Sequence, residues 1–344
     1  MNKRNTTIQD IAKAAGVSTA TVSRALSNPE LLSQTKLLAV KEAIKNTGYR
    51  VNRNARNLRK QKAAAVLVLV PNLGNPFFSK ILSGINKGFS GTDYSVLIAD
   101  SESFDDKTQR IQNAFQDGQI DGLISLDGAF SENEVVEISY DLIDKPVVFA
   151  CEWVENAAFS SIRSDNDSGA RLAVQHLYNL GHRKITHISG PDSNILTKVR
   201  QAGFLSECKK LKLDLTNENI IRGDFSIQGG YAAASQILSF SEKPTAITCA
   251  SDEIAIGVIS QLRKAGISVP NDISVVGFDD IEISNTYIPT LTTVRQDRFE
   301  LGLSAAQSMV KSLNNEKPQL SIYNKVIDVE LVIRESTAPP LSTK

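Results

Sequence analysis

Apolar residues near the start of the chain recur at helical spacing in two short runs that are separated by a turn. The first run comprises Ile8, Ile11, Ala12 and Ala15, and the second comprises Val22, Ala25 and Leu26. Between them, Gly16 tolerates a positive φ and Ser18 is a good N-cap for the second helix. The spacing therefore predicts a helix-turn-helix, in which two short helices pack their apolar faces together.

The apolar pattern continues for one more helix and then stops. Ser33 is placed to begin this helix, Val40, Ala43 and Ile44 give it an apolar face, and Gly48 is placed to end it. The following residues, 51–62, are mostly Asn, Arg and Lys, with too little apolar surface for a core of their own. We expect an all-α three-helix head over 1–50 and a hinge over 51–62 that is unfolded alone and helical where phosphates neutralise its arginines.

Beyond the hinge, over residues 63–344, apolar runs alternate with amphipathic stretches. The predicted strands are 65–70, 94–99, 121–125, 146–150, 185–189, 244–249, 273–277 and 326–333. The predicted helices are 77–90, 105–117, 166–180, 198–210, 226–239, 253–265 and 297–313. This alternation is typical of doubly wound parallel sheets, and about 280 residues are too many for one such sheet. The pattern predicts an α/β core of two lobes that face a cleft.

Charge is distributed very unevenly along the chain, although the formal net charge is zero. Residues 1–62 contain thirteen Lys and Arg against three acidic residues, so the head carries about +10 and the remainder about −10. By itself, this charge fits either a solvated basic arm or a segment that binds a polyanion. The helix-turn-helix inside the basic segment favours double-stranded DNA as the partner.

Several protein classes are disfavoured by what the sequence lacks. We expect no secretion signal and no membrane span, since the longest apolar run, 63–70, is only eight residues long. Three widely spaced cysteines give no metal-binding pattern and fit a reducing, cytoplasmic compartment. No nucleotide-binding glycine motif, serine-hydrolase motif or zinc-protease motif is present. The sequence thus predicts a binding protein with no cofactor and no metal, not an enzyme.

Aromatic, acidic and amide side chains recur where the predicted strands of the core end. They include Phe77, Phe78, Trp153, Asn194, Arg200, Phe225, Asp252 and Asp279. Ligands bind at the carboxyl ends of the strands in such folds, and rings with carboxylates suit a polyhydroxylated ligand. Alternatives remain: the phenylalanines could be plain core, Trp153 could pack the lobes together, and the aspartate at 279 could belong to a capping turn. The recurrence at several strand ends favours a site.

These motifs together resemble the LacI/GalR family of bacterial transcription regulators along essentially the whole chain. The resemblance is carried by TIQDIAKAAGVSTATVSRAL near the start, NRNARNL in the hinge, LGHRKI, SDEIAIG, VPNDISVVGFDD and PTLTTVRQ. It implies a head, a hinge helix and a core like a periplasmic sugar-binding protein, acting as a homodimer on a near-palindromic operator with a small-molecule effector in the cleft. It also implies lobe crossings near 164, 296 and 323. The N-lobe would then be 63–164 with 296–323, and the C-lobe 165–295 with 324–340.

The resemblance also implies roles for particular residues. Thr19, Ala20 and Arg24 match base-reading positions, and Thr21, Ser23 and Asn52 match phosphate contacts. Ala55 and Leu58 match a pair that enters the minor groove and kinks the duplex. The implied effector-binding residues are Phe77, Phe78, Asp127, Glu152, Trp153, Asn194, Arg200, Phe225, Asp252 and Asp279.

The effector itself remains open between two ligand classes. The chain looks closest to the cytidine-responsive repressor branch, which implies a nucleoside, whereas a cleft of rings and carboxylates serves a sugar equally well. Two other classes of protein stay open on the core alone: a sugar- or nucleoside-binding component of transport, and an enzyme that uses the cleft. The basic head and the lack of a secretion signal argue against the first, and the missing catalytic motifs argue against the second.

Overall fold

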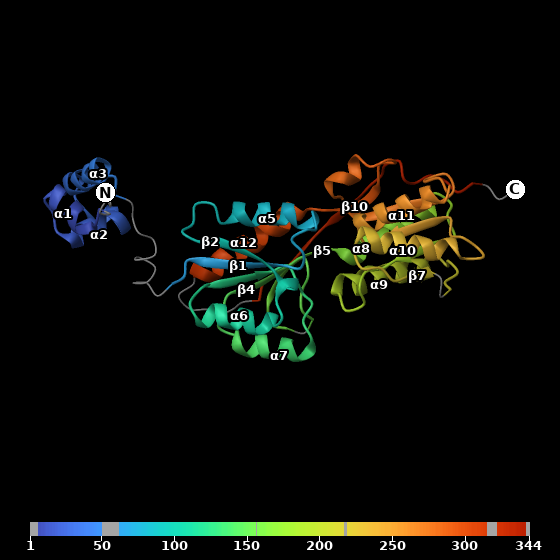
Figure 1. The fold of residues 1–344 in the computed structure, drawn as a ribbon, viewed down its shortest axis with the longest axis horizontal. Helices are drawn as coiled ribbons and strands as arrows, with labels where there is room; N and C mark the ends of the chain where they lie inside the picture. The colour runs from blue at the N-terminus through green and yellow to red at the C-terminus, as the bar shows by residue number, and fades with distance from the viewer. Residues whose placement is uncertain (1–5, 50–61, 156, 217–218, 315–321, 342–344) are drawn as a thin grey trace. The chain divides into compact units, whose positions relative to one another are not determined.

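The structure is a computed structural model that describes residues 6–49, 62–155, 157–216, 219–314 and 322–341. The chain forms two compact units, Met1–Lys62 and Ala63–Lys344. Figure 1 shows a small helical unit and a larger α/β unit. We call the first the head and the second the core.

The described part of the head is a helical bundle around a small apolar core. Its helices are α1 (Ile8–Ala15), α2 (Thr19–Ser27) and α3 (Gln34–Thr47), with a 3-10 turn, η1 (Pro29–Leu31). Ile11, Val22 and Val40 are fully buried between the helices. Gly16 ends α1 at φ +64°, and Ser18 caps α2 by accepting the Thr21 N–H at 3.2 Å. The helix-turn-helix predicted from the apolar spacing is thus formed.

The core contains two six-stranded sheets, one in each lobe. The N-lobe sheet has β1 (Ala65–Val70), β2 (Ser95–Asp100), β3 (Gly122–Ser125), β4 (Val147–Ala150), β5 (Ser160–Ser164) and β11 (Asn324–Ile327) in the order β11-β5-β4-β3-β1-β2. The C-lobe sheet has β6 (Ile185–Ile188), β7 (Ile220–Ile221), β8 (Ala246–Cys249), β9 (Ser274–Asp279), β10 (Thr292–Gln296) and β12 (Val329–Val332) in the order β12-β10-β9-β8-β6-β7. The two sheets have the same strand order when the strands of each lobe are counted along the chain.

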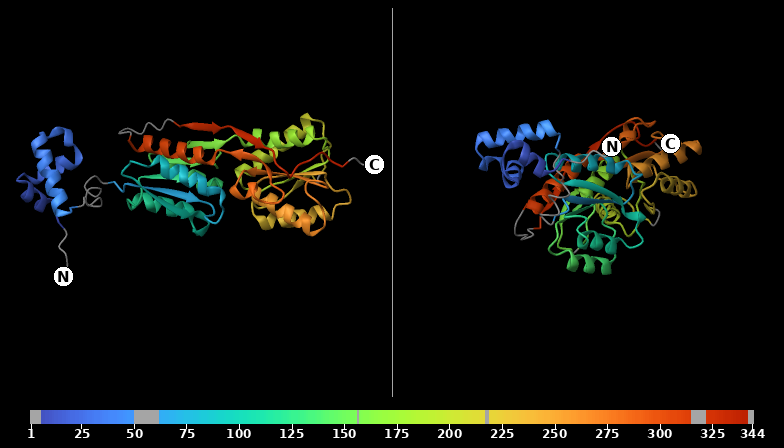
Figure 2. Two further views of the ribbon diagram at one scale, coloured as in Figure 1. Left: turned by 90° about the horizontal axis from the view of Figure 1, so that it is seen from above. Right: turned by 60° about the vertical axis from the view of Figure 1, so that its left-hand side comes forward.

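Helices cover both faces of each sheet, as Figures 1 and 2 show. The N-lobe helices are α5 (Phe77–Gly88), α6 (Lys107–Gln116), α7 (Glu132–Asp141) and α12 (Arg298–Asn314), with the 3-10 turn η2 (Ser101–Ser103). The C-lobe helices are α8 (Asn166–Asn179), α9 (Ile195–Lys210), α10 (Ile227–Leu238) and α11 (Asp252–Lys264), with η4 (Glu282–Asn285). Every residue of β1 is buried, as expected for a central strand covered on both faces.

Helices α5 and α12 pack unusually closely on one face of the N-lobe sheet. A Cβ at Gly84 would collide with the Phe299 carbonyl oxygen, and one at Gly302 would collide with that of Ile81. Because α12 follows a crossing from the C-lobe, this packing ties the returning chain to the N-lobe.

The chain crosses between the lobes after β5, after β10 and after β11. The third crossing lies at Asp328 and not near Tyr323, because β11 still pairs with β5 in the N-lobe sheet. The predicted strand 326–333 is therefore two strands in different lobes. β11 runs parallel to β5 because both lead out of the N-lobe, whereas β12 enters the C-lobe against β10 and is antiparallel. The C-lobe sheet is accordingly mixed and not fully parallel as predicted.

Candidate functional site

A cavity of about 310 Å³ lies between the two lobes, where strands of both sheets end. Eight of the ten predicted effector-binding residues line it: Phe77, Phe78, Asp127, Glu152, Asn194, Arg200, Phe225 and Asp279. Both lobes contribute, since the first four belong to the N-lobe and the last four to the C-lobe. These residues meet at one location because the carboxyl ends of the parallel strands of both sheets face it.

Two aromatic rings and a buried carboxyl form much of the N-lobe wall. Phe77 and Phe78 begin α5, directly after the β1 loop, with ring centroids 5.1 Å apart in an edge-to-face arrangement. Glu152 follows β4 and is 7% exposed. It accepts hydrogen bonds from the Gly128 N–H at 2.9 Å and from Asn194 Nδ2 at 2.8 Å. The second bond crosses the cavity from the C-lobe, so Glu152 joins the lobes.

Glu152 and Asp127, the two carboxylates of this wall, differ in their counter-charges. Asp127 accepts from Lys107 Nζ at 2.8 Å and from Ser101 Oγ at 2.7 Å, so a cation balances it. Burial raises the pKa of Glu152 to about 7, against the weaker lowering effect of its Gly128 and Asn194 hydrogen bonds. Glu152 therefore exchanges its proton near neutral pH.

The C-lobe wall is built around an arginine and an aspartate that are both buried. Arg200, on α9, stacks on the Phe278 ring at 3.8 Å and lies 3.6 Å from Asp279 Oδ1. Its Nε donates to Asn166 Oδ1 at 2.8 Å, and Nη1 donates to the Ala250 carbonyl. Asp279 also accepts from Gln296 Nε2 at 2.7 Å. Burial raises the pKa of Asp279, and the nearby Arg200 opposes that rise.

Backbone strain is concentrated at this cavity. Among the described non-glycine residues, Cys151, Phe225 and Asp279 line the cavity with positive φ angles of 70°, 63° and 115°. Such conformations cost free energy and persist where surrounding contacts hold them, often at functional sites. The three residues follow β4, β7 and β9 or end them, so the strain fixes the side chains that face a ligand.

Two predicted effector-binding residues do not line the cavity. Asp252, at the start of α11, has no exposed surface and accepts from the Ile281 N–H at 2.9 Å and from Ser284 Oγ at 2.6 Å. The direct contact predicted for it is corrected: Asp252 holds the turn after β9 and thereby positions Asp279. Trp153 is corrected likewise, because its ring lines a separate pocket with Phe159 and stacks under the Arg163 guanidinium at 4.6 Å.

The sequence reasoning also left out residues that line the cavity. They are Pro71, Asn72, Glu102, Ala129, Cys151, Pro191, Ser193, Leu196, Asp224, Ser226, Ser251 and Glu253. Asn72 follows β1, and Ser251 and Glu253 follow β8. The strand-end rule that found the predicted residues also points to these positions, and their short polar side chains gave no further signal.

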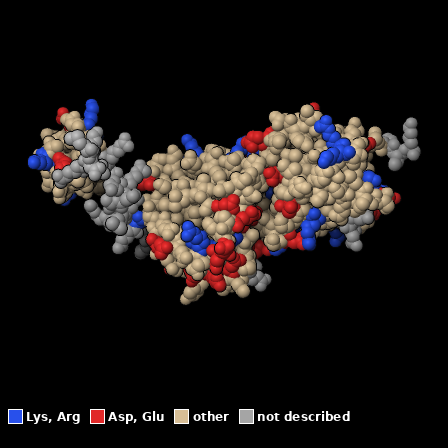
Figure 3. All heavy atoms as spheres, in the orientation of Figure 1, with Lys and Arg blue, Asp and Glu red and all other residues tan. Residues whose placement is uncertain are grey.

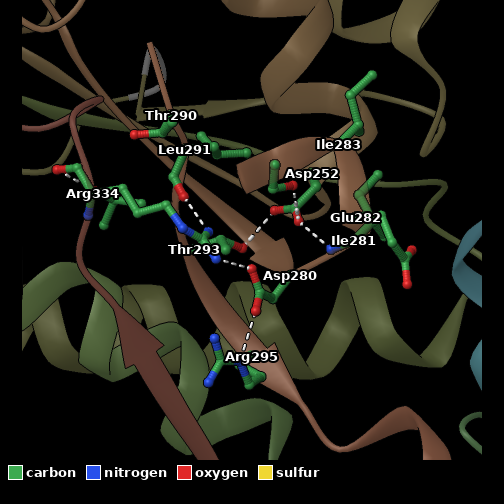
Figure 4. A network of polar contacts seen from close by, with 12 residues as sticks. Asp252, Asp280, Ile281, Glu282, Ile283, Thr290, Leu291, Thr293, Arg295 and Arg334 are labelled. Carbon is green, nitrogen blue, oxygen red and sulfur yellow. Dashed lines mark hydrogen bonds and ion pairs between the residues drawn. The ribbon is translucent and has the colours of Figure 1, made fainter. Parts of the chain in front are cut away.

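A charged network surrounds Asp280, the residue that follows Asp279 (Figure 4). Asp280 pairs with Arg295 Nε at 2.6 Å and with Arg334 Nη2 at 2.6 Å. Burial alone would raise the pKa of Asp280, but the two arginine hydrogen bonds outweigh it and lower that pKa. Arg295 lies on β10 and Arg334 follows β12, so the network joins two strands that lead to crossings.

Arg298 connects the lobes just beside this network. It begins α12, is 2% exposed, and donates to the Phe77 carbonyl at 3.1 Å and to the Asp280 carbonyl at 3.0 Å. One acceptor belongs to the N-lobe and the other to the C-lobe. The same guanidinium therefore contacts the backbone next to both cavity walls.

In the head, the predicted DNA-binding residues of α2 lie on its open side. Thr19, Ala20 and Arg24 are exposed, and Thr21 and Ser23 are partly exposed. The predicted hinge contacts Asn52, Ala55 and Leu58 lie outside the described residues. No helix in the described ranges is long and apolar enough to span a bilayer. Nor do His, Cys, Asp and Glu side chains gather into a metal-binding group anywhere in those ranges.

Comparison with known proteins gives matches to both units. Residues 7–52 match the family described as bacterial regulatory proteins, lacI family, and residues 174–337 match a periplasmic binding protein-like domain. The HTH-type transcriptional repressor CytR of Escherichia coli (strain K12) is 34% identical over 331 residues, which cover 96% of each chain.

Solved structures give the same result. The lac repressor dimer bound to operator and the anti-inducer ONPF has a TM-score of 0.86 at 27% identity, over 97% of this chain and 100% of that one. A LacI family transcriptional regulator from Enterococcus faecium with bound ribose has a TM-score of 0.70 at 28% identity, over 80% of this chain and 99% of that one. With a helix-turn-helix head, a two-lobed core and relatives matched over almost their full length, this chain belongs to the lacI family of bacterial regulatory proteins and is a DNA-binding transcriptional repressor with an effector-binding core.

Proposed function

We propose that this repressor binds a near-palindromic operator as a homodimer and that a nucleoside bound between its lobes controls its operator affinity. The observation that carries the proposal is the cavity itself, in which the Phe77 and Phe78 rings lie near carboxyl and amide groups from both lobes. Flat rings suit stacking against a base or a sugar face, and carboxylates accept hydrogen bonds from ribose hydroxyls.

A sugar effector is the second candidate, and one comparison favours it. The Enterococcus faecium regulator was solved with bound ribose, which supports a pentose in the corresponding cavity of this chain. A nucleoside contains the same pentose together with a base. The rings at the N-lobe wall support the larger ligand.

The proposed control depends on contacts that join the lobes. Asn194 donates to Glu152 across the cavity, and Arg298 holds carbonyls of both lobes. A ligand that replaces or strengthens these contacts favours one lobe arrangement over another. Operator affinity then follows by linkage, through the hinge segment 51–62.

In the head, we assign base contacts to Thr19, Ala20 and Arg24, and phosphate contacts to Thr21, Ser23 and Asn52. Ala55 and Leu58 would enter the minor groove at the operator centre. The structure of α2 supports the base contacts, because Thr19, Ala20 and Arg24 are exposed and take no part in the buried core of the head. The assignments at 52, 55 and 58 rest on the sequence pattern.

Dimerisation is supported by apolar side chains left exposed on the core. Leu97 and Ile98 on the edge strand β2 are 44% and 48% exposed, and Ile283 and Ile288 near η4 are 45% and 76% exposed. Exposed apolar patches in a soluble protein favour a protein partner. A second copy of the chain would cover one patch from each lobe.

Two measurements test the proposal. An operator is first selected from a random DNA pool, and its binding is followed by fluorescence anisotropy while nucleosides and monosaccharides are added. Arg24→Ala should lower discrimination between this operator and random DNA by about 1–3 kcal/mol, the usual worth of a specific base contact. Lys45→Ala, an exposed change on α3, is the control and should leave discrimination intact. Equal discrimination by wild type and Arg24→Ala would refute the assignment.

A further inference from the structure

The cavity is strongly acidic, which restricts the ligands it accepts. Among the described residues that line it, six are carboxylates and only Arg200 is a cation; the carboxylates are Glu102, Asp127, Glu152, Asp224, Glu253 and Asp279. Figure 3 shows acidic side chains also gathered on the surface around α6 and α7 in the same lobe as Glu152. Fields of one sign in a low-dielectric cleft act on every ligand that enters.

The single arginine does not offset this charge for a ligand. Arg200 is 2% exposed, its Nε and Nη1 donate to Asn166 and Ala250, and its charge faces Asp279 at 3.6 Å. The ring of Phe278 covers the face of its guanidinium. Two of the three guanidinium nitrogens and one face of Arg200 are therefore already engaged.

Four of the six carboxylates have no ion-pair partner among the residues that the structure describes: Glu102, Glu152, Asp224 and Glu253. Glu152 is the most deeply buried of these. Its oxygens already accept from Gly128 and Asn194, and the charges that face it are Asp127, which Lys107 balances, and Arg200, which Asp279 engages. Burial raises its pKa to about 7, and burial with Asp279 raises that of Glu253.

We infer that the cavity accepts only effectors without a negative charge, and that Glu152 is the specificity-determining residue that rejects anions. This inference rests on the proposed function, since it excludes nucleotides and sugar phosphates as effectors and leaves neutral nucleosides and sugars. A phosphate group placed in the cavity would face several unbalanced carboxylates at short range, where each like-charge contact is unfavourable by an amount equivalent to about tenfold in affinity or more.

The test compares matched ligand pairs by isothermal titration calorimetry on the full-length protein at pH 8. The probes are cytidine with cytidine 5′-monophosphate, and ribose with ribose 5-phosphate. In the wild type, each phosphorylated member should bind at least about tenfold more weakly than its partner. Glu152→Gln should narrow that ratio severalfold, and Glu253→Gln should narrow it less. Glu155→Gln, the same change at an exposed position away from the cavity, should leave the ratio unchanged.

The outcomes separate this inference from the proposed function. If a phosphorylated probe binds as tightly as its partner, or if Glu152→Gln leaves the ratio unchanged while its circular dichroism shows a folded protein, the inference is overturned and the effector class stands. If none of the four probes binds, the nucleoside and sugar assignment fails. The rejection of anions is then tested with inorganic phosphate and citrate, by measuring whether each anion slows hydrogen exchange of the backbone amides around the cavity. Slower exchange in the wild type overturns the inference. Slower exchange only in a Glu152→Gln/Glu253→Gln protein supports it.

Discussion

The N-lobe and the C-lobe build their sheets in the same strand order, yet they place acidic side chains in opposite electrostatic surroundings. In the N-lobe, Glu152 is buried with two neutral hydrogen-bond donors, and its pKa is raised to about 7. In the C-lobe, Asp280 is held by Arg295 and Arg334, which lower its pKa against the effect of burial. One fold thus presents an unbalanced carboxyl in the N-lobe wall of the cavity and a neutralised network in the C-lobe, next to the cavity-lining Asp279.

This difference separates two tasks that a ligand-controlled protein must perform. The C-lobe network fixes a strained turn, since Asp279 and Asp280 both have positive φ and are held by side chains from β10, α12 and the chain after β12. That wall is preorganised before any ligand arrives. The N-lobe wall has a carboxyl whose protonation and partners can change on binding, so we expect selectivity there and rigidity in the C-lobe.

The largest expected effect comes from the residue that joins the two walls. Arg298→Ala removes a buried guanidinium together with its hydrogen bonds to the Phe77 and Asp280 carbonyls, which should lower the free energy of unfolding by about 2–4 kcal/mol. Urea denaturation of the full-length protein measures it. Arg295→Ala is the matched control, because its ion pairs are largely solvated at 46% side-chain exposure and should be worth about 1 kcal/mol or less. If both variants lose the same free energy of unfolding, Arg298 does not stabilise the contact between the lobes.

The second prediction concerns Glu152 and the pH dependence of stability. Because its pKa is about 7 in the folded protein and ordinary when unfolded, the folded state holds the extra proton between these values. Stability therefore falls as pH rises from about 4.5 to about 7. In Glu152→Gln this contribution disappears, and the difference in unfolding free energy between pH 5 and pH 8 should shrink by about 1–3 kcal/mol.

Paired urea titrations of the wild type, Glu152→Gln and the exposed control Glu155→Gln decide this point. The control should follow the wild type at both pH values. An unchanged pH dependence in Glu152→Gln would show that Glu152 is ionised at neutral pH with a compensating partner, and the contrast between the lobes would then disappear.

Much of the fold follows from the apolar pattern, and the exceptions are strands β5 and β10 at the crossings, helix α7 and the two-residue strand β7. β1 and β3 are continuous apolar runs buried on both faces, so their pattern predicts them. β5 and β10 are rich in Ser, Thr and Arg and give no such signal, although Ser161, Thr292 and Thr293 are buried. Their polar groups are satisfied by partners distant in sequence, as when Thr293 Oγ1 donates to Asp252.

The candidate site was likewise predictable only in part. Phe77, Glu152 and Asp279 could be placed because strand ends of parallel sheets meet in space. Asp252 also follows a strand, and no local feature distinguishes a carboxylate that faces the cavity from one that turns inward to Ile281 and Ser284. That distinction depends on the strained turn after β9, which only the folded core reveals.

The third prediction concerns Asp280, the carboxylate that Arg295 and Arg334 neutralise in the C-lobe. Asp280→Asn removes a carboxylate with a lowered pKa, which stabilises the folded state above its unfolded pKa and loses that contribution as pH falls. Its unfolding free energy should be about 1 kcal/mol below that of the wild type at pH 7, with the difference shrinking toward pH 3. This direction is opposite to that of Glu152→Gln, and a common direction in the two urea series would contradict the assignment of opposite surroundings.

The smallest effect is expected at Trp153, which follows Glu152 but lies outside the cavity lining. Because its ring packs under Arg163 in a separate pocket, Trp153→Phe should change effector affinity by less than about twofold and stability by about 0.5–1 kcal/mol. Calorimetric titration with the ligand found in the screen measures the first, and urea denaturation the second. Phe77→Leu, a similar loss of ring surface on the cavity itself, should weaken binding severalfold. A tenfold loss of affinity in Trp153→Phe would extend the ligand-contacting wall past Glu152 and make the N-lobe share of the site larger than the cavity indicates.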